Sequence, residues 1–218
     1  MAELSADPFQ AARLLLNLRR QGVTDDSVLS AIETVSRAGF CRRSDADLAM
    51  EDCSLPISCG QAIPPPATAA RLLQAAGIGR ARAARVFLVG AGSGWMAALL
   101  SRMGADVLAA ERFATLVAHA EERLEAAGHG RVRILHADGL DGPPPETAPF
   151  DVVLLTGTVE AVPPVLREVL TGNGRLVAPR RTGDGRVVLD LIDGDGTSVS
   201  QLAPPRLATL RRGLSRTL

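Results

Sequence analysis

Apolar residues along this chain switch between two spacings, which predicts helices and strands in alternation. The stretch 86–89, VFLV, is continuously apolar and rich in strand formers, so it predicts a strand buried on both faces. The stretch 95–104, WMAALLSRMG, has apolar residues at helical spacing and closes at Gly104. The glycine-rich turn AGSG joins the two. A strand, a glycine turn and a helix form the opening unit of a nucleotide-type α/β domain.

The same patterns predict the other elements. Helices are expected over 7–21, over 24–37 with Thr24 or Asp25 as the cap, and over 67–78, 113–128 and 159–172. Strands are expected over 105–111, 132–138, 150–156, 174–179 and 186–193, with a last one over 205–212. Residues 40–66 show no sustained periodicity and are interpreted as a long binding loop. The order predicts a mostly parallel, seven-stranded sheet with an antiparallel edge, preceded by N-terminal helices.

The length and composition predict one globular unit in two parts. With 218 residues, of which 46% are hydrophobic, the chain can bury a full core. We expect residues 1–80 to form the N-terminal helices and the long loop, packed on a core formed by residues 81–218. Nothing in the pattern requires a second copy, and a monomer is the expectation.

Charge and the rarer residues exclude several classes of protein. The 24 basic and 24 acidic residues cancel, and the arginines are spread along the chain, which is unlike a nucleic-acid binder. No apolar run reaches the roughly 18 residues that span a bilayer, and no basic segment precedes an apolar one at the N-terminus, so we expect a cytoplasmic protein that binds no membrane. The three cysteines and three histidines lack ligand spacing, so no metal site is expected.

The glycine turn narrows the choice of ligand. A dinucleotide fingerprint needs Gly-x-Gly-x-x-Gly, whereas Gly90, Gly92 and Gly94 are spaced Gly-x-Gly-x-Gly. A phosphate-binding loop of the Walker type needs a lysine, and the sequence has none. The spacing suits a ligand without phosphate, whose amino-acid end and ribose lie against bare backbone. S-adenosylmethionine is the common ligand of that description.

Two acidic residues support that ligand. Glu111 ends the second core strand, where a carboxylate can accept hydrogen bonds from both ribose hydroxyls. Asp138, followed by Gly139, ends the third strand, where a carboxylate can accept from an adenine amino group. Either acid alone would be unremarkable, because strand-terminal acids are often only solvated. Together, after this glycine turn, they favour a cofactor site at the carboxyl ends of the strands.

Over nearly the whole chain the sequence resembles the protein L-isoaspartate O-methyltransferases. LRRQGVTDDSVLSAIETVSRAGF at 18–40 is similar to the family's paired helices. The stretch at 49–78 carries a Glu-Asp pair, then Leu-Pro-Ile and Gly-Gln-x-Ile, as the family signature does. Asp138-Gly139, PFD at 149–151, Thr156 and GNGRLVAP at 172–179 also follow the family pattern, and PRLATLRRG at 205–213 resembles its last strand.

The resemblance implies a Rossmann-like, S-adenosylmethionine-dependent methyltransferase fold. It also implies the methyl acceptor: the free α-carboxylate of an L-isoaspartyl residue in a damaged protein or peptide, so that the activity would be protein repair. A carboxylate is already nucleophilic, so positioning and exclusion of water can supply most of the acceleration without a general base. The predicted cofactor-binding residues are Ala62, Ile63, Gly90, Ala91, Gly92, Ser93, Gly94, Glu111, Arg112, Asp138 and Gly139.

Departures from the family pattern leave an alternative open. Ala62 and Pro64 stand where the family has a Thr and a Ser, and Pro64 offers neither a hydroxyl nor a backbone N–H. Leu88 replaces an acidic residue before the glycine turn, and Trp95 replaces a Tyr. No catalytic residue is assigned, and the candidates at the acceptor side are Gln61, Pro64 and Thr156. The alternative is a divergent member that does not catalyse this reaction and binds S-adenosylmethionine, another substrate or a protein partner.

Overall fold

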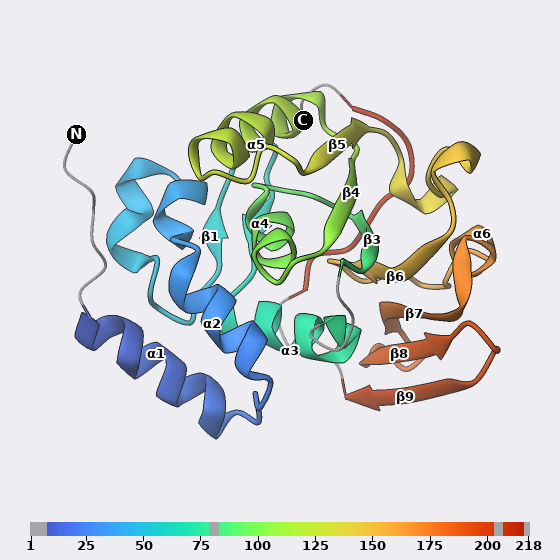
Figure 1. Ribbon diagram of the computed structural model, residues 1–218, viewed down its shortest axis with the longest axis horizontal. Coiled ribbons are helices and arrows are strands. Elements are labelled where there is room, and N and C mark those ends of the chain that lie inside the picture. The colour runs from blue at the N-terminus through green and yellow to red at the C-terminus, as the bar shows by residue number, and fades with distance from the viewer. Residues whose placement is uncertain (1–7, 79–82, 203–206, 216–218) are drawn as a thin grey trace.

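The computed structural model describes residues 8–78, 83–202 and 207–215, and its centre is a seven-stranded sheet (Figure 1). The strands lie in the order β5-β4-β3-β6-β7-β8-β9. The first five run parallel, and β8 and β9 are antiparallel to their neighbours, which confirms the predicted mostly parallel sheet with an antiparallel edge. The strand bounds are β3 Arg85–Val89, β4 Asp106–Glu111, β5 Arg133–His136, β6 Phe150–Leu155, β7 Leu170–Arg181, β8 Val187–Asp193 and β9 Ser198–Leu202.

The central strand is buried on both faces, as its apolar run predicts. Val86 and Leu88 belong to one cluster of buried side chains, whereas Phe87 and Val89 belong to another. Successive side chains of a strand point to opposite faces, so the two clusters lie on the two sides of the sheet. The sheet is therefore the middle layer of the fold.

Helices cover the two faces unequally. The first cluster joins one face of the sheet to α1, α2, α3, α4 and α5, while the second is covered mainly by the short elements η4 and α6. In Figure 1 the N-terminal helices lie beside the sheet and α4 lies near the centre. The helix bounds are α1 Pro8–Arg20, α2 Asp26–Thr34, α3 Pro66–Ala76, α4 Trp95–Arg102, α5 Ala114–Ala126 and α6 Val165–Glu168. The short 3₁₀ elements are η1 Arg37–Phe40, η2 Arg43–Leu48, η4 Gly139–Asp141 and η5 Pro145–Thr147.

Asp25, one of the two predicted caps, begins α2. Its carboxylate accepts hydrogen bonds from the backbone N–H groups of Ser27 and Val28, which have no partner inside the helix. Thr24 instead donates its backbone N–H to the side-chain oxygen of Gln74 on α3. The cap and this bond fix α2 against α3.

The predicted helix over 159–172 is wrong. Only Val165–Glu168 is helical, and β7 already begins at Leu170. Pro163 and Pro164 interrupt the segment, because a proline lacks the backbone N–H and disfavours helical geometry in the residue before it. The apolar residues of the segment are therefore divided between a loop, the one-turn helix α6 and the start of β7.

The predicted last strand over 205–212 is also wrong. The edge strand is β9, which pairs antiparallel with β8, and residues 205 and 206 lie outside the described residues. Residues 207–215 form an extended segment whose β pairing within the described residues is limited to isolated bridges to Thr158 and Phe113. The sequence Ser-Val-Ser-Gln is too polar to be recognised as a strand, but an edge strand is held by backbone hydrogen bonds to one neighbour.

The long loop over 40–66 contains more structure than predicted. It holds η2 and a two-stranded antiparallel pair, in which β1 (Leu55–Pro56) pairs with β2 (Ala62–Ile63). Asp52 caps the following helix α3 by accepting from the backbone N–H of Ala67. The loop is therefore an ordered hairpin that ends at a capped helix.

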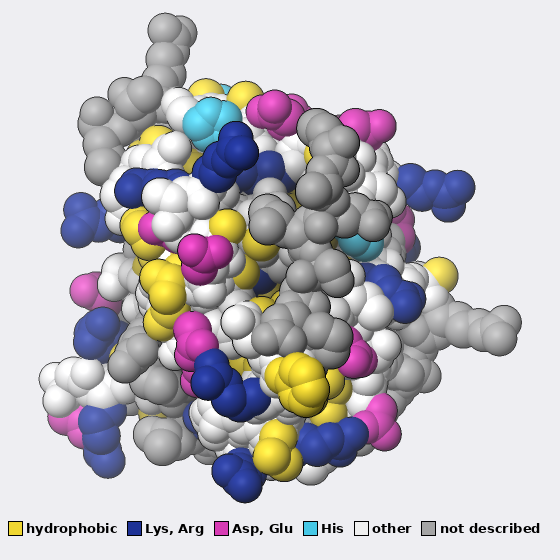
Figure 2. Space-filling model, turned by 90° about the vertical axis from the view of Figure 1, so that its left-hand side faces the viewer, with side chains coloured by type: hydrophobic (Ala, Val, Ile, Leu, Met, Phe, Trp, Pro, Cys, Tyr) yellow, Lys and Arg dark blue, Asp and Glu magenta, His cyan; other side chains and the backbone are white. Residues whose placement is uncertain are grey.

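Three further observations concern the surface, the helices and the cysteines. On the face shown in Figure 2, arginine and acidic side chains are interspersed rather than gathered by sign. None of the described helices is long and apolar enough to cross a bilayer. Cys41, Cys53 and Cys59 are not joined by disulfides.

Candidate functional site

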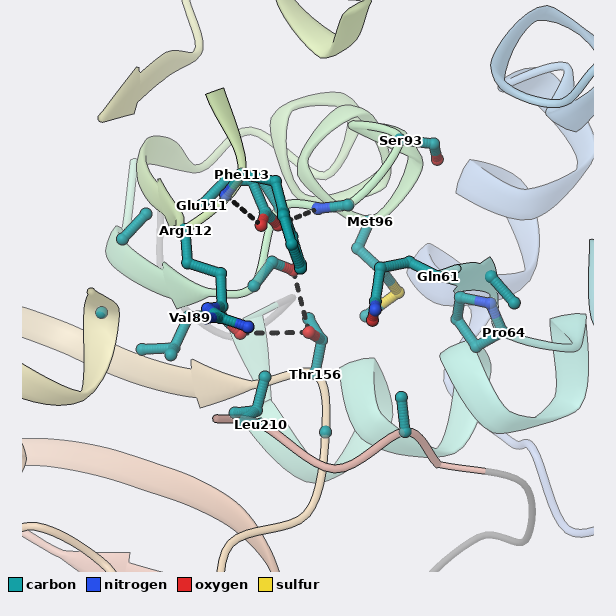
Figure 3. A pocket seen from close by; sticks show the side chains of 18 of the residues that line it. Gln61, Pro64, Val89, Ser93, Met96, Glu111, Arg112, Phe113, Thr156 and Leu210 are labelled. Carbon is teal, nitrogen blue, oxygen red and sulfur yellow. Dashed lines mark hydrogen bonds between the residues drawn. The ribbon is translucent and has the colours of Figure 1, made fainter. Parts of the chain in front are cut away.

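A cavity of about 360 Å³ opens at the carboxyl ends of β3, β4 and β6, where ligands bind in parallel sheets (Figure 3). That volume suits a small-molecule ligand. The acceptor loop (residues 53–64), the glycine turn, the strand ends and the segment 207–211 all contribute to its wall. The structure brings most of the predicted site residues together around it: Gln61, Ala62, Ile63, Pro64, Gly90, Ala91, Gly92, Ser93, Glu111, Arg112, Asp138, Gly139 and Thr156.

Two glycines of the turn serve different purposes. A Cβ added to Gly90 would lie 2.5 Å from the Thr156 hydroxyl oxygen, so Gly90 is required by close packing between β3 and β6. A Cβ on Gly92 would meet nothing nearer than Ile57 at 3.8 Å. Gly92 has φ +58°, which favours glycine, and leaves bare backbone open to the cavity.

Gly94 lies outside the cavity. It has φ +91°, and a Cβ there would lie 3.3 Å from the Cβ of Ala120 and 3.2 Å from Leu124 on α5. Gly94 therefore allows the start of α4 to pack against α5. The spacing of Gly94 from Gly92 predicts contact with the ligand. In the structure, the element that leaves no room for a side chain at Gly94 is the helix α5.

Glu111 is held in place by two backbone donors. Its side chain is buried, and its two oxygens accept from the N–H of Gly92 at 2.9 Å and of Phe113 at 3.0 Å. A carboxylate offers about four acceptor positions, so about two remain for a ligand. In Figure 3 the carboxylate lies beside the glycine turn. This geometry fits a diol placed over the end of β4.

Asp138 and Arg112 are tied to the C-terminal segment. One carboxylate oxygen of Asp138 accepts from the N–H of Leu140 at 3.0 Å, and the other from the N–H of Gly213 at 2.6 Å. Arg112 donates from Nε to the carbonyl of Gly213 at 2.7 Å, and its guanidinium lies 4.7 Å from the centre of the Phe113 ring. These two residues thus anchor a segment that covers the site, in addition to lining it.

That segment was missed as part of the site. Thr158, just beyond β6, donates its N–H to the carbonyl of Ala208 at 2.7 Å and accepts from the N–H of Leu210 at 2.9 Å. Leu207, Ala208, Thr209, Leu210 and Arg211 therefore line the cavity. The sequence pattern predicts a sheet strand here, because an extended segment that crosses the strand ends has no periodicity that distinguishes it from a strand.

At the acceptor side, the hydrogen bonds limit what each candidate can donate. The Thr156 hydroxyl donates to the carbonyls of Val89 and Gly90, so its proton is already used. Gln61 points into the cavity in Figure 3 and uses one amide hydrogen on the carbonyl of Cys59 at 3.1 Å, which leaves the other. Pro64 lines the wall without a donor. Ser54, which sequence reasoning missed, also lines the cavity and has a hydroxyl with no partner among the described residues.

Ser93 and Trp95 form the start of α4. The Ser93 hydroxyl accepts from the N–H of Trp95 at 3.3 Å and points away from the cavity centre in Figure 3, so Ser93 contributes backbone to the wall. Trp95 is buried, lines the cavity and donates its indole N–H to the carbonyl of Val35. This bond ties the glycine turn to the N-terminal helices.

The comparisons with known proteins agree with this geometry. Residues 9–203 match the protein-L-isoaspartate(D-aspartate) O-methyltransferase family, PCMT. The chain is 38% identical over 168 residues to a protein-L-isoaspartate O-methyltransferase of Dechloromonas aromatica, covering 77% of each chain. It is 40% identical over 171 residues to protein-L-isoaspartate O-methyltransferase 2 of Nitrosospira multiformis, covering 78% of this chain and 80% of the relative.

Among solved structures, the fold is similar to a Plasmodium falciparum protein assigned to the same family and determined with S-adenosyl-L-homocysteine. The TM-score is 0.79 at 23% identity, over 92% of this chain and 98% of that one. A second structure, named protein-L-isoaspartate O-methyltransferase, gives a TM-score of 0.79 at 24% identity, over 91% of this chain and 65% of that one. At these identities the likeness concerns the fold alone. The family match and the curated relatives carry the assignment: the chain belongs to the protein-L-isoaspartate O-methyltransferase family.

Proposed function

We propose that this protein transfers a methyl group from S-adenosylmethionine to the free α-carboxylate of L-isoaspartyl residues in damaged proteins or peptides. The observation that carries the proposal is the geometry of Glu111. Its carboxylate is fixed by the N–H groups of Gly92 and Phe113 at the edge of a cavity shared with the acceptor loop. A nucleoside site and an acceptor wall thus face one space, as a methyl transfer requires.

The residues of the cavity fit this cofactor. The open backbone at Gly92 accommodates its amino-acid end, and Glu111 retains acceptor capacity for the ribose hydroxyls. Phe113 and Leu140 offer apolar surface beside Asp138 for the adenine. When bound, S-adenosylmethionine supplies an electrophilic methyl group on a sulfonium. The chain itself binds, orients and excludes water, and these contributions suffice for an acceptor that is already an anion.

Two side chains are our candidates for binding the acceptor carboxylate. Ser54 and Gln61 both line the cavity from the acceptor loop, and Gln61, which points into the cavity in Figure 3, has a second amide hydrogen left for a ligand. Hydrogen bonds to a charged group are worth about 1.5–3 kcal/mol each, so two of them compensate for a donor that Pro64 lacks. Thr156 holds the glycine turn in place, and its hydroxyl proton is committed to two carbonyls.

We also propose that the protein acts as a monomer in the cytoplasm and binds neither nucleic acid nor membrane. The interspersed charges on the face in Figure 2 are consistent with this. The division into residues 1–80 and 81–218 is proposed as two parts of one unit, because one buried cluster contains Leu18 and Phe40 as well as Val86 and Leu154.

The test combines binding and transfer in one preparation. Calorimetric titration with S-adenosylhomocysteine measures the cofactor site, and methyl transfer is then measured on an isoaspartyl peptide and on the matched aspartyl peptide. We expect micromolar binding and transfer to the isoaspartyl peptide alone. Binding without transfer would support the divergent, non-catalytic alternative, and the absence of binding would contradict the cofactor site itself.

A further inference from the structure

The side chain of Arg37, in η1, is buried beneath the acceptor loop. Arg37 is only 2% exposed, and its Nη2 donates to the carbonyls of Cys53 at 2.7 Å and Pro64 at 2.9 Å. Longer bonds run from the guanidinium to three more carbonyls of the same region, those of Ala49, Glu51 and Ile63. A single side chain therefore holds both ends of the loop 53–64.

The charge of Arg37 is compensated by backbone dipoles. It forms no ion pair with any carboxylate in the described parts of the chain, and its Nε has no hydrogen-bond partner there. Burial lowers its pKa to about 10, which still leaves it charged near neutral pH. A buried charge is costly unless hydrogen bonds satisfy it, so the carbonyls of the loop are bound in a fixed arrangement around the guanidinium.

Arg37 also contacts the cofactor side of the cavity. Its Cζ lies 5.2 Å from the centre of the Trp95 ring. Trp95 follows Gly94 directly, starts α4 and lines the cavity. The same side chain thus touches the acceptor loop through hydrogen bonds and the end of the glycine turn through ring stacking.

We propose that Arg37 is a positioning residue for the methyl acceptor, an inference that rests on the proposed function. It holds the carbonyl of Cys53, which precedes Ser54, and the carbonyl of Pro64, which lies three residues after Gln61. Arg37 therefore sets the distance between Ser54 and Gln61, the two donors that we assign to the acceptor carboxylate. Arg37 does not itself line the cavity. Its loss is expected to weaken acceptor binding and to leave cofactor binding intact, because Glu111, Thr156 and the Trp95 indole hold the glycine turn through hydrogen bonds that do not involve Arg37.

Arg85 provides a matched control at the opposite end of the sheet. It donates to the carbonyls of Thr147 at 2.7 Å and Pro149 at 2.6 Å, and its Cζ lies 5.2 Å from the centre of the Phe150 ring. It begins β3, at the end away from the cavity. Arg85→Met thus removes similar carbonyl bonds and a similar ring contact without touching the acceptor loop.

The kinetic test compares Arg37→Met with Arg85→Met. For Arg37→Met we expect KM for an isoaspartyl peptide to rise about tenfold or more, while kcat and the Kd for S-adenosylhomocysteine stay within about threefold. For Arg85→Met we expect all three constants to stay within about threefold. Arg37→Lys keeps the charge but loses the planar fork of donors, so an intermediate KM is expected, and it replaces Arg37→Met if that variant does not fold. Equal rises of KM in the Arg37 and Arg85 variants would overturn the inference.

A second measurement does not depend on activity. Hydrogen exchange of the backbone amides in 53–64 should be at least about tenfold faster in Arg37→Met than in the parent, with α4 unchanged, because the loop loses its buried anchor. Trp95 is the only tryptophan, and the sequence has no tyrosine, so intrinsic fluorescence reports directly on the stacked ring. If the parent transfers no methyl to the isoaspartyl peptide, the proposed function fails, and hydrogen exchange alone decides the role of Arg37. Unchanged exchange in 53–64 would then overturn it.

Discussion

Replacing Glu111 by glutamine tests the cofactor site most specifically. The carboxylate accepts from the backbone N–H groups of Gly92 at 2.9 Å and Phe113 at 3.0 Å. Glutamine has the same shape but only one oxygen, so its NH₂ group must face one of these two donors. The N–H left without an acceptor destabilises the free and the bound protein alike, so it lowers the melting temperature and does not change Kd. The change in Kd comes from the ribose, which loses a hydrogen bond to a charged acceptor worth about 1.5–3 kcal/mol. A loss of about 2 kcal/mol corresponds to a roughly 30-fold higher Kd for S-adenosylhomocysteine.

Calorimetric titration of the folded variant measures this change. Asp106→Asn is the control, because Asp106 is exposed at the opposite end of the same strand and pairs with Arg85 only at 3.9 Å. We expect that control to bind S-adenosylhomocysteine as the parent does. Thermal unfolding of both variants shows that each is folded at the titration temperature. If Glu111→Gln also binds within about threefold of the parent, the reasoning on Glu111 is refuted.

Three further predictions follow from other parts of the molecule. Gly90→Ala should lower the melting temperature clearly more than Gly104→Ala, because both glycines have positive φ but only the Cβ on Gly90 would meet Thr156; similar losses in a thermal scan would contradict the packing argument. Ser54→Ala and Gln61→Leu should each raise KM for an isoaspartyl peptide about tenfold, the loss of one hydrogen bond to a charge, without changing the Kd for S-adenosylhomocysteine; an unchanged KM in steady-state kinetics would remove them from the acceptor site. Burial opposes ionisation of Asp190, but hydrogen bonds from Arg180 and Ser200 outweigh it and hold its pKa below the usual value. Since the folded pKa is lowered, the stabilisation is present above about pH 4 and is lost as the pH falls through the folded pKa. Asp190→Asn should therefore lower the free energy of unfolding by about 1.5–3 kcal/mol at neutral pH, and the difference should narrow below about pH 4 in denaturant titrations; a constant difference would contradict the assignment.

The sequence predicted the central strands and the cofactor side because both depend on local patterns. The apolar run at 86–89 leaves no polar face, Glu111 ends the buried strand β4, and Asp138 lies two residues beyond the end of β5. Parallel strands bring their carboxyl ends to one edge of the sheet. The positions of Glu111 and Asp138 at or just after the ends of two such strands were therefore enough to predict that they lie on the same side of the fold.

Other features depend on contacts between distant segments. The segment 207–215 covers the site through bonds to Thr158, Asp138 and Arg112, and none of these is visible in its own pattern. The distance of Gly94 from Gly92 predicts a ligand-binding glycine, whereas in the structure a side chain at Gly94 would press against Ala120 and Leu124 of α5. Arg37 was unremarkable in sequence because nothing local distinguishes a buried arginine from an exposed one.

The identity of the methylated atom tests the central claim most directly. The parent protein is incubated with S-adenosylmethionine and an isoaspartyl peptide, and the product is fragmented in a mass spectrometer beside the aspartyl control. We expect one methyl ester, located on the isoaspartyl residue and lost in mild base, with no product from the control. Methylation of both peptides, or of another residue in the isoaspartyl peptide, would contradict the account.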